Sequence, residues 1–100
     1  MQSRYEPEFD REQGFAEADW LRCLPGAVRG AAIDLATPGQ ARVVVAGGTL
    51  TLRWQVLPPR KIGLARFARL AVQYRFEGVA DDERQAFMKY FDLYTQRGGG

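Results

Sequence analysis

The chain has 100 residues, 46% hydrophobic and 26% charged, with a formal net charge of +2 at pH 7; this is typical of one globular domain and excludes a disordered chain. It contains no histidine, which excludes histidine-based acid–base catalysis, Ser-His or Cys-His nucleophiles and zinc sites built with histidine. No apolar run approaches the roughly 20 residues of a membrane-spanning helix, and we therefore predict a cytoplasmic protein without membrane contact.

The first part of the chain is predicted to hold a loosely ordered terminus followed by a helix. Residues 1–8 mix charges with a proline and are expected to be loosely held. Over residues 9–24, apolar side chains recur at helical spacing, which predicts a helix that Pro25-Gly26 ends. The only cysteine, Cys23, falls on the apolar side of this helix, and we interpret it as a buried, inert thiol.

Four strands are predicted in the centre of the chain, over residues 27–36, 42–46, 49–57 and 69–76. In the last two segments, apolar and polar residues alternate, which is typical of strands with one buried and one open face. Pro58 and Pro59 are expected to stop the third strand, because neither can donate a ladder hydrogen bond. Residues 60–67 are then interpreted as a connector with Ile62 and Leu64 tucked inward.

The dipeptide Gly47-Gly48 predicts a two-residue hairpin turn between the second and third strands. A turn at this position places Arg42 directly opposite Arg53, where the like charges repel each other. In the preceding turn, we expect Leu35 to lie opposite Val43.

A final helix is predicted from Asp81 or Asp82 to about Gln96, followed by a flexible tail at residues 98–100. Its apolar stripe is wider than one core-facing side needs, and we interpret the flanking Met88 and Leu93 as a candidate oligomer interface. The assembled prediction is a single α+β domain spanning residues 1–100. It is a two-layer sandwich of helix, four mainly antiparallel strands and helix, with both helices on one face of the sheet.

Basic residues are concentrated in the middle of the sequence. Residues 53–76 contain six basic side chains and no acidic one, whereas residues 1–20 contain six acidic and two basic side chains. The open face of the predicted sheet is therefore a candidate surface for a ligand or partner. Its residues are Arg42, Arg53, Gln55, Arg69, Gln73 and Arg75. The acidic N-terminus is an open question, because it would reduce the charge of this face if it rested against it.

The sequence favours a non-catalytic binding protein that associates with itself, as a homodimer, or with another protein. The alternative is a binder of nucleic acid or of a phosphorylated or anionic ligand through the arginine-rich face. Nucleic acid is less favoured because no aromatic residue is predicted on this face to stack on bases. An enzyme is also less favoured, since Asp34 is the one acidic residue predicted beside the face. No metal or cofactor is expected, since the glycines have no phosphate-loop or dinucleotide-binding spacing.

Overall fold

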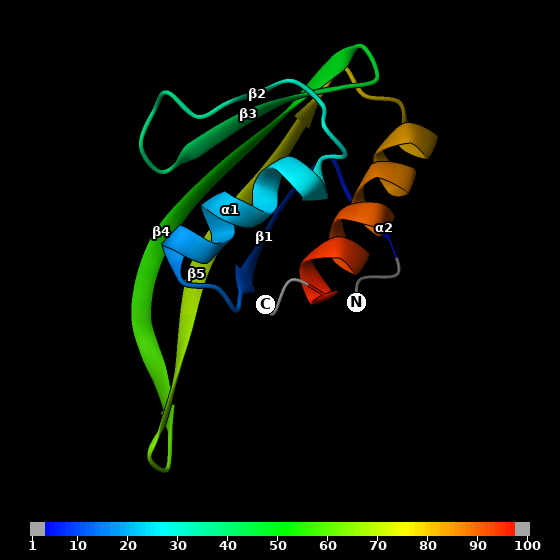
Figure 1. Ribbon diagram of the computed structural model, residues 1–100. Coiled ribbons are helices and arrows are strands. Elements are labelled where there is room, and N and C mark those ends of the chain that lie inside the picture. The colour runs from blue at the N-terminus through cyan, green and yellow to red at the C-terminus, as the bar shows by residue number, and fades with distance from the viewer. Residues whose placement is uncertain (1–3, 98–100) are drawn as a thin grey trace.

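The computed structural model describes residues 4–97, which form a five-stranded antiparallel sheet and two helices (Figure 1). The helices are α1 (Glu17–Ala27) and α2 (Asp81–Arg97). The strands lie in the order β1-β5-β4-β3-β2. Their bounds are β1 (Glu8–Gln13), β2 (Ile33–Asp34), β3 (Gln40–Val45), β4 (Gly48–Ile62) and β5 (Ala65–Glu77). The predicted α+β class is confirmed, with five strands in place of four, and the predicted tail lies outside the described residues.

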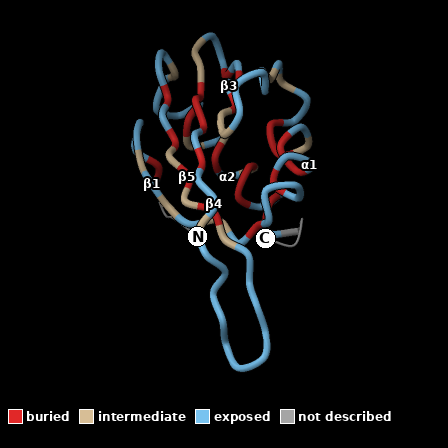
Figure 2. The backbone as a smooth tube through the Cα atoms, turned by 90° about the vertical axis from the view of Figure 1, so that its left-hand side faces the viewer, coloured by how far each residue is buried: buried red, intermediate tan, exposed pale blue. Residues whose placement is uncertain are grey.

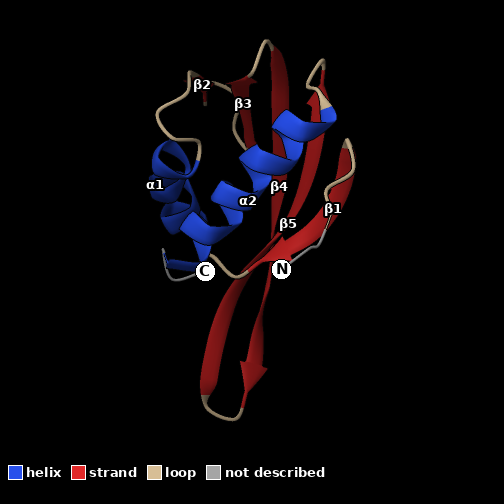
Figure 3. Cartoon of the chain, turned by 90° about the vertical axis from the view of Figure 1, so that its right-hand side faces the viewer, coloured by secondary structure: helices blue, strands red, loops and turns tan. Residues whose placement is uncertain are grey.

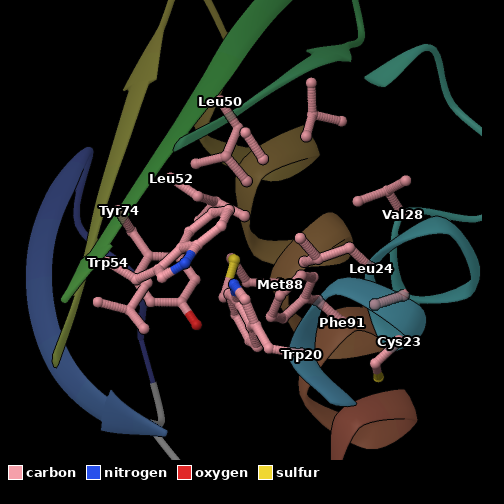
Figure 4. Close-up of a cluster of buried hydrophobic side chains, with 14 of the residues drawn as sticks. Trp20, Cys23, Leu24, Val28, Leu50, Leu52, Trp54, Tyr74, Met88 and Phe91 are labelled. Atoms are coloured by element: carbon pink, nitrogen blue, oxygen red, sulfur yellow. The ribbon is translucent and has the colours of Figure 1, made fainter. Parts of the chain in front are cut away.

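The hydrophobic core lies between the helices and one face of the sheet. The even-numbered residues of β4 from 50 to 54 and of β5 from 70 to 76 are buried, as their alternation predicts. Trp20 of α1 packs edge-on against Trp54, and Phe91 of α2 packs edge-on against Tyr74, each with ring centroids 5.9 Å apart (Figure 4). The two helices thus contact the same face, and they lie on the same side of the sheet in Figure 3.

The first element of the described residues is strand β1, so the prediction of a helix over residues 9–24 is wrong in its first part. Strand β1 pairs antiparallel with β5, from Glu8 opposite Arg75 to Gln13 opposite Leu70. Its residues alternate between exposed and half-buried, and this period of two prevails over a helical spacing that Gly14 weakens. Tyr5, expected in a loosely held segment, is buried.

Helix α1 continues through Pro25-Gly26 to Ala27, so this dipeptide does not end it. The turn around it is stabilised by packing, because Leu24, Ala27 and Val28 are all buried in the core. Gly26 also allows a close approach between the two helices, since a Cβ atom there would collide with the ring of Tyr94 in α2. Tertiary contacts therefore override the local helix-ending signal.

The β3–β4 hairpin turns at Ala46 and Gly47, one residue earlier than predicted. Both residues have positive φ, 44° and 82°, as a type I′ turn requires. Arg42 consequently pairs with Thr51 rather than with Arg53. The register differs from the prediction by two residues, which leaves every side chain on its predicted face. Strand β2 shows the same kind of difference, because Ile33 rather than Leu35 lies opposite Val43.

Strands β4 and β5 continue past the core as a two-stranded projection, residues 57–69, which we call the arm (Figure 2). Pro58 and Pro59 do not end β4; they lie at a register shift, and pairing resumes at Arg60 opposite Phe67. An irregularity of this kind accommodates prolines because no ladder hydrogen bond is required of them there. Ile62 and Leu64, predicted to be tucked inward, are 61% and 106% exposed.

Candidate interaction surfaces

The predicted arginine-rich surface lies on the face of the sheet opposite the helices. Its six residues, which are exposed or half-buried, are Arg42, Arg53, Gln55, Arg69, Gln73 and Arg75. Cross-strand pairing brings them together, because Arg53 lies opposite Gln73, and Thr51 lies between Arg42 and Arg75 in one row across the sheet. The structure therefore places all six predicted residues on one face.

Strand β1 adds three carboxylates to this same face. Glu8, Asp10 and Glu12 lie opposite Arg75, Gln73 and Ala71, respectively. Glu12 accepts a hydrogen bond from Arg69 Nη1 at 2.8 Å and another from Arg60 Nη2 at 3.3 Å. The face is therefore a mixed surface of acidic and basic groups, because the acidic N-terminal segment is a strand of the sheet.

An open hollow of about 620 Å³ follows the boundary between the acidic and basic groups. Side chains from three strands line it, among them Asp10, Glu12, Arg53, Gln55 and Gln73. Carboxylate, guanidinium and amide groups lie next to one another in this hollow. Such a surface suits the mixed charges of another protein better than a uniformly anionic ligand.

The arm carries the two most exposed large apolar side chains among the described residues, Leu64 and Ile62, and Phe67 is 52% exposed. Residues that face each other across two strands point to the same side of the sheet. One side of the arm therefore holds Arg60, Ile62, Ala65 and Phe67. The other side holds Lys61 and Arg66, which form no ion pair within residues 4–97.

The arm differs from the sequence-based prediction because Pro58 and Pro59, which predict the end of a strand, lie inside β4. A signal for it was present, since Gly63 lies midway between two segments of strand-forming character. Gly63 has a φ of 60°, as the turn at the tip of the arm requires.

A separate group of polar side chains joins β1, β5 and α2 at the edge of the core. Asp92 of α2 is buried and accepts hydrogen bonds from Arg11 and from the hydroxyl of Tyr5. Arg11 Nη1 lies 3.0 Å from Asp92 Oδ2, and the guanidinium carbon lies 4.6 Å from the centre of the Tyr74 ring. The Tyr74 hydroxyl in turn donates to Gln13 Oε1 at 2.7 Å. This cluster fastens the last helix to the first strand.

The two tyrosine hydroxyls and the guanidinium of this cluster keep their protons around neutral pH. Burial, together with the hydrogen bond to Asp92, raises the pKa of the Tyr5 hydroxyl to about 12. Burial also raises the pKa of Tyr74. Burial opposes the charge of Arg11, but the hydrogen bonds to Asp92 and Tyr74 outweigh it and raise the pKa of the guanidinium. The arrangement is therefore suited to holding the fold together and not to exchanging protons near pH 7.

Tyr5 makes the stability of the protein sensitive to alkaline pH. Its hydroxyl ionises near pH 10 in an unfolded chain and near pH 12 in the folded protein, so between these values the folded state binds more protons. We expect the stability that Tyr5 contributes, which is fully present below pH 10, to be lost as the pH rises toward 12. The advantage of the wild type over Tyr5→Phe in urea unfolding should shrink between neutral pH and about pH 11. A constant difference would contradict this assignment.

The remaining predicted candidates lie apart from these surfaces. Met88 is fully buried between α2 and the sheet (Figure 4), which removes it from the predicted oligomer interface. Leu93 is exposed on α2 and stays a candidate there. Cys23 is buried, and burial raises the pKa of its thiol. Asp34 lies opposite Arg42 at the β2 end of the sheet, away from any second acidic residue of the open face.

Metal-site geometry and membrane-helix character within residues 4–97, and similarity to known proteins, do not add a further candidate function. Within residues 4–97, no cluster of three or more cysteine, aspartate or glutamate side chains is placed to hold a metal ion. Neither helix there combines the length and apolar character needed to cross a membrane. A scan against protein-family models finds no match for this chain, and a search of curated proteins finds none either.

Proposed function

We propose that this chain is a non-catalytic binding protein that associates with itself. The arm is the observation that carries the proposal, because it projects from the core (Figure 2). It exposes Ile62, Leu64 and Phe67 to solvent. Apolar side chains gathered on a projecting element favour association, since covering them removes apolar area from water. None of the three packs in the hydrophobic core, so their apolar character does not stabilise the monomer.

The state of the charged groups supports binding rather than catalysis. Arg11 and Asp92 form an ion pair in the buried cluster. Glu12 forms ion pairs with Arg60 and Arg69. General acid–base catalysis needs a group that titrates near the working pH and reaches an open cavity. The groups whose pKa values are raised, Tyr5 and Tyr74 among them, keep their protons throughout the neutral range.

Binding of nucleic acid or another anionic ligand is the second candidate. The basic side of the arm favours it, because Lys61 and Arg66 are free of ion pairs within the described residues. The sheet face weakens it, because Glu8, Asp10 and Glu12 would repel phosphate groups there. A polyanion would cover only the basic side of the arm, whereas a protein partner would also cover the apolar side. We therefore place self-association first.

Size-exclusion chromatography with light scattering tests the proposal. We expect the mass to rise from that of the 11.3 kDa monomer toward twice that value as the protein concentration increases. Added salt should preserve or strengthen the association, because it screens repulsion between two basic arms. A chain that stays strictly monomeric at high concentration would overturn the proposal.

A further inference from the structure

We infer that two copies of this chain pair along their arms, through main-chain hydrogen bonds between the β5 strands over residues 65–69. The inference rests on the proposed self-association and identifies the surface that carries it. On the outer side of β5, strand β1 ends at Gln13 opposite Leu70. Beyond this point no strand of the described residues pairs with the outer edge of β5, and a strand from a second copy would continue the sheet there.

The arm has two open edges, and only one of them can accept a strand. On the outer edge of β4, Arg53 is the last residue paired with β3, and the Trp54 N–H still donates to the carbonyl of Gly39 at 2.9 Å; beyond it no strand of residues 4–97 pairs with this edge. Pro58 and Pro59 lie on that edge and have no N–H to donate, which protects it from strand addition. The open edge of β5 contains no proline and is therefore the edge available for pairing.

Alternation along β5 identifies the backbone groups that point outward. The N–H of Phe76 donates to the carbonyl of Pro7 at 2.7 Å, on the β1 side of the strand. In an antiparallel ladder, the backbone groups of every second residue point to the same edge. Those of Ala68 and Arg66 consequently point to the β1 side as well, where no strand of residues 4–97 reaches them.

Charge and space select one register for a two-fold pair of β5 strands. A register centred on Phe67 places this residue opposite its own copy, with Arg66 opposite Ala68 and Arg69 opposite Ala65. A register centred on Arg66 would place the guanidinium groups of the two Arg66 copies opposite each other, and these like charges repel. A register centred on Ala68 would bring Arg66 opposite Leu70, where Gln13 already pairs. The Phe67 register avoids both problems. Its two-fold symmetry is closed, which limits the assembly to two copies.

This register also uses the exposed apolar side of the arm. Each Arg66–Ala68 pair exchanges two main-chain hydrogen bonds, and the two Phe67 rings meet at a position without such bonds, where cross-strand side chains are closest. Ile62 and Ala65 point to the same side as Phe67. The joined arms would therefore carry a continuous apolar strip across four strands, and the aromatic pair adds to its stability.

Ala68→Pro tests whether this edge carries the association. The substitution removes an N–H that points away from β4, so circular dichroism should show a folded monomer. We expect the dimer dissociation constant, measured by sedimentation velocity, to rise about tenfold or more because each copy loses a hydrogen bond and gains a steric block. Lys61→Pro is the matched control on the protected edge of the same arm, and it should change the constant by less than about threefold.

Phe67→Glu and Phe67→Lys test the register. Each variant alone should lose the dimer, because like charges would meet across the two-fold axis, and an equal mixture should restore it as a heterodimer. A monomeric wild type would overturn both the proposed self-association and this inference. A wild-type dimer that Ala68→Pro does not weaken, or variants whose mixture stays monomeric, would overturn the arm pairing alone and leave self-association standing.

Discussion

Replacing Asp92 by alanine is expected to lower the free energy of unfolding by about 3 kcal/mol, near the lower end for breaking a buried ion pair. The carboxylate side chain is only 7% exposed and that of Arg11 20%, so little water would reach the guanidinium left behind. The variant also removes the acceptor of the Tyr5 hydroxyl. The cost arises from leaving buried groups without partners rather than from the loss of one attraction.

Urea unfolding of Asp92→Ala, compared with that of the control variant Glu83→Ala, tests whether the loss of stability is specific to the buried carboxylate. Glu83 is an exposed acidic residue of the same helix, and its removal should cost less than about 1 kcal/mol. The double variant Arg11→Met with Asp92→Leu should recover much of the loss, because it replaces both charges with apolar groups. If Asp92→Ala cost no more than Glu83→Ala, the ion pair would not fasten α2 to β1.

Trp20→Ala is expected to destabilise the fold by about 3–5 kcal/mol, because it empties a large volume at the centre of the core. Trp20 is fully buried, and its ring lies 5.6 Å from that of Phe15, 5.9 Å from that of Trp54 and 6.0 Å from that of Phe91, measured between centroids. These rings belong to the loop before α1, to the sheet and to α2. A cavity at this position would therefore loosen the contacts between both helices and the sheet.

Trp20→Phe is the matched control for this prediction. The indole Nε1 of Trp20 has no hydrogen-bond partner among the described residues, so phenylalanine removes an unsatisfied buried donor while keeping most of the ring. We expect it to cost less than half as much as alanine, with the fluorescence of Trp54 reporting urea unfolding in both variants. Equal costs would show that the loss does not depend on the cavity.

The faces of the long strands could be predicted from the sequence because alternation is a local property. The even-numbered residues of β4 from 50 to 54 and of β5 from 70 to 76 are buried as predicted, and Thr51, although buried too, lies in one row with Arg42 and Arg75 of the open face. A register error of two residues in the β3–β4 hairpin left these orientations intact. The final helix was predictable for the same reason, since its apolar stripe and acidic first turn lie within one segment.

The remaining features depend on partners that are distant in the sequence. Glu8 and Arg75 become neighbours only because β1 adds to the outer edge of β5, and no local pattern indicates that edge. The contact of Arg11 with Asp92 spans 81 positions, so neither residue could be recognised as part of a buried pair. The prolines of the arm led to a wrong prediction for a different reason. The rule that proline ends a strand uses local sequence only, and it fails here because the β4–β5 register shifts at these residues.

The placement of β1 beside β5 has a consequence for the chain as it is synthesised. Even the closest pair between these strands, Gln13 with Leu70, joins opposite halves of the sequence. At roughly 5–20 residues per second, the first strand would leave the ribosome about 3–11 s before the segment that receives it. Strand β1 thus waits for β5 before it reaches its final position, and Phe9 stays in water during that delay.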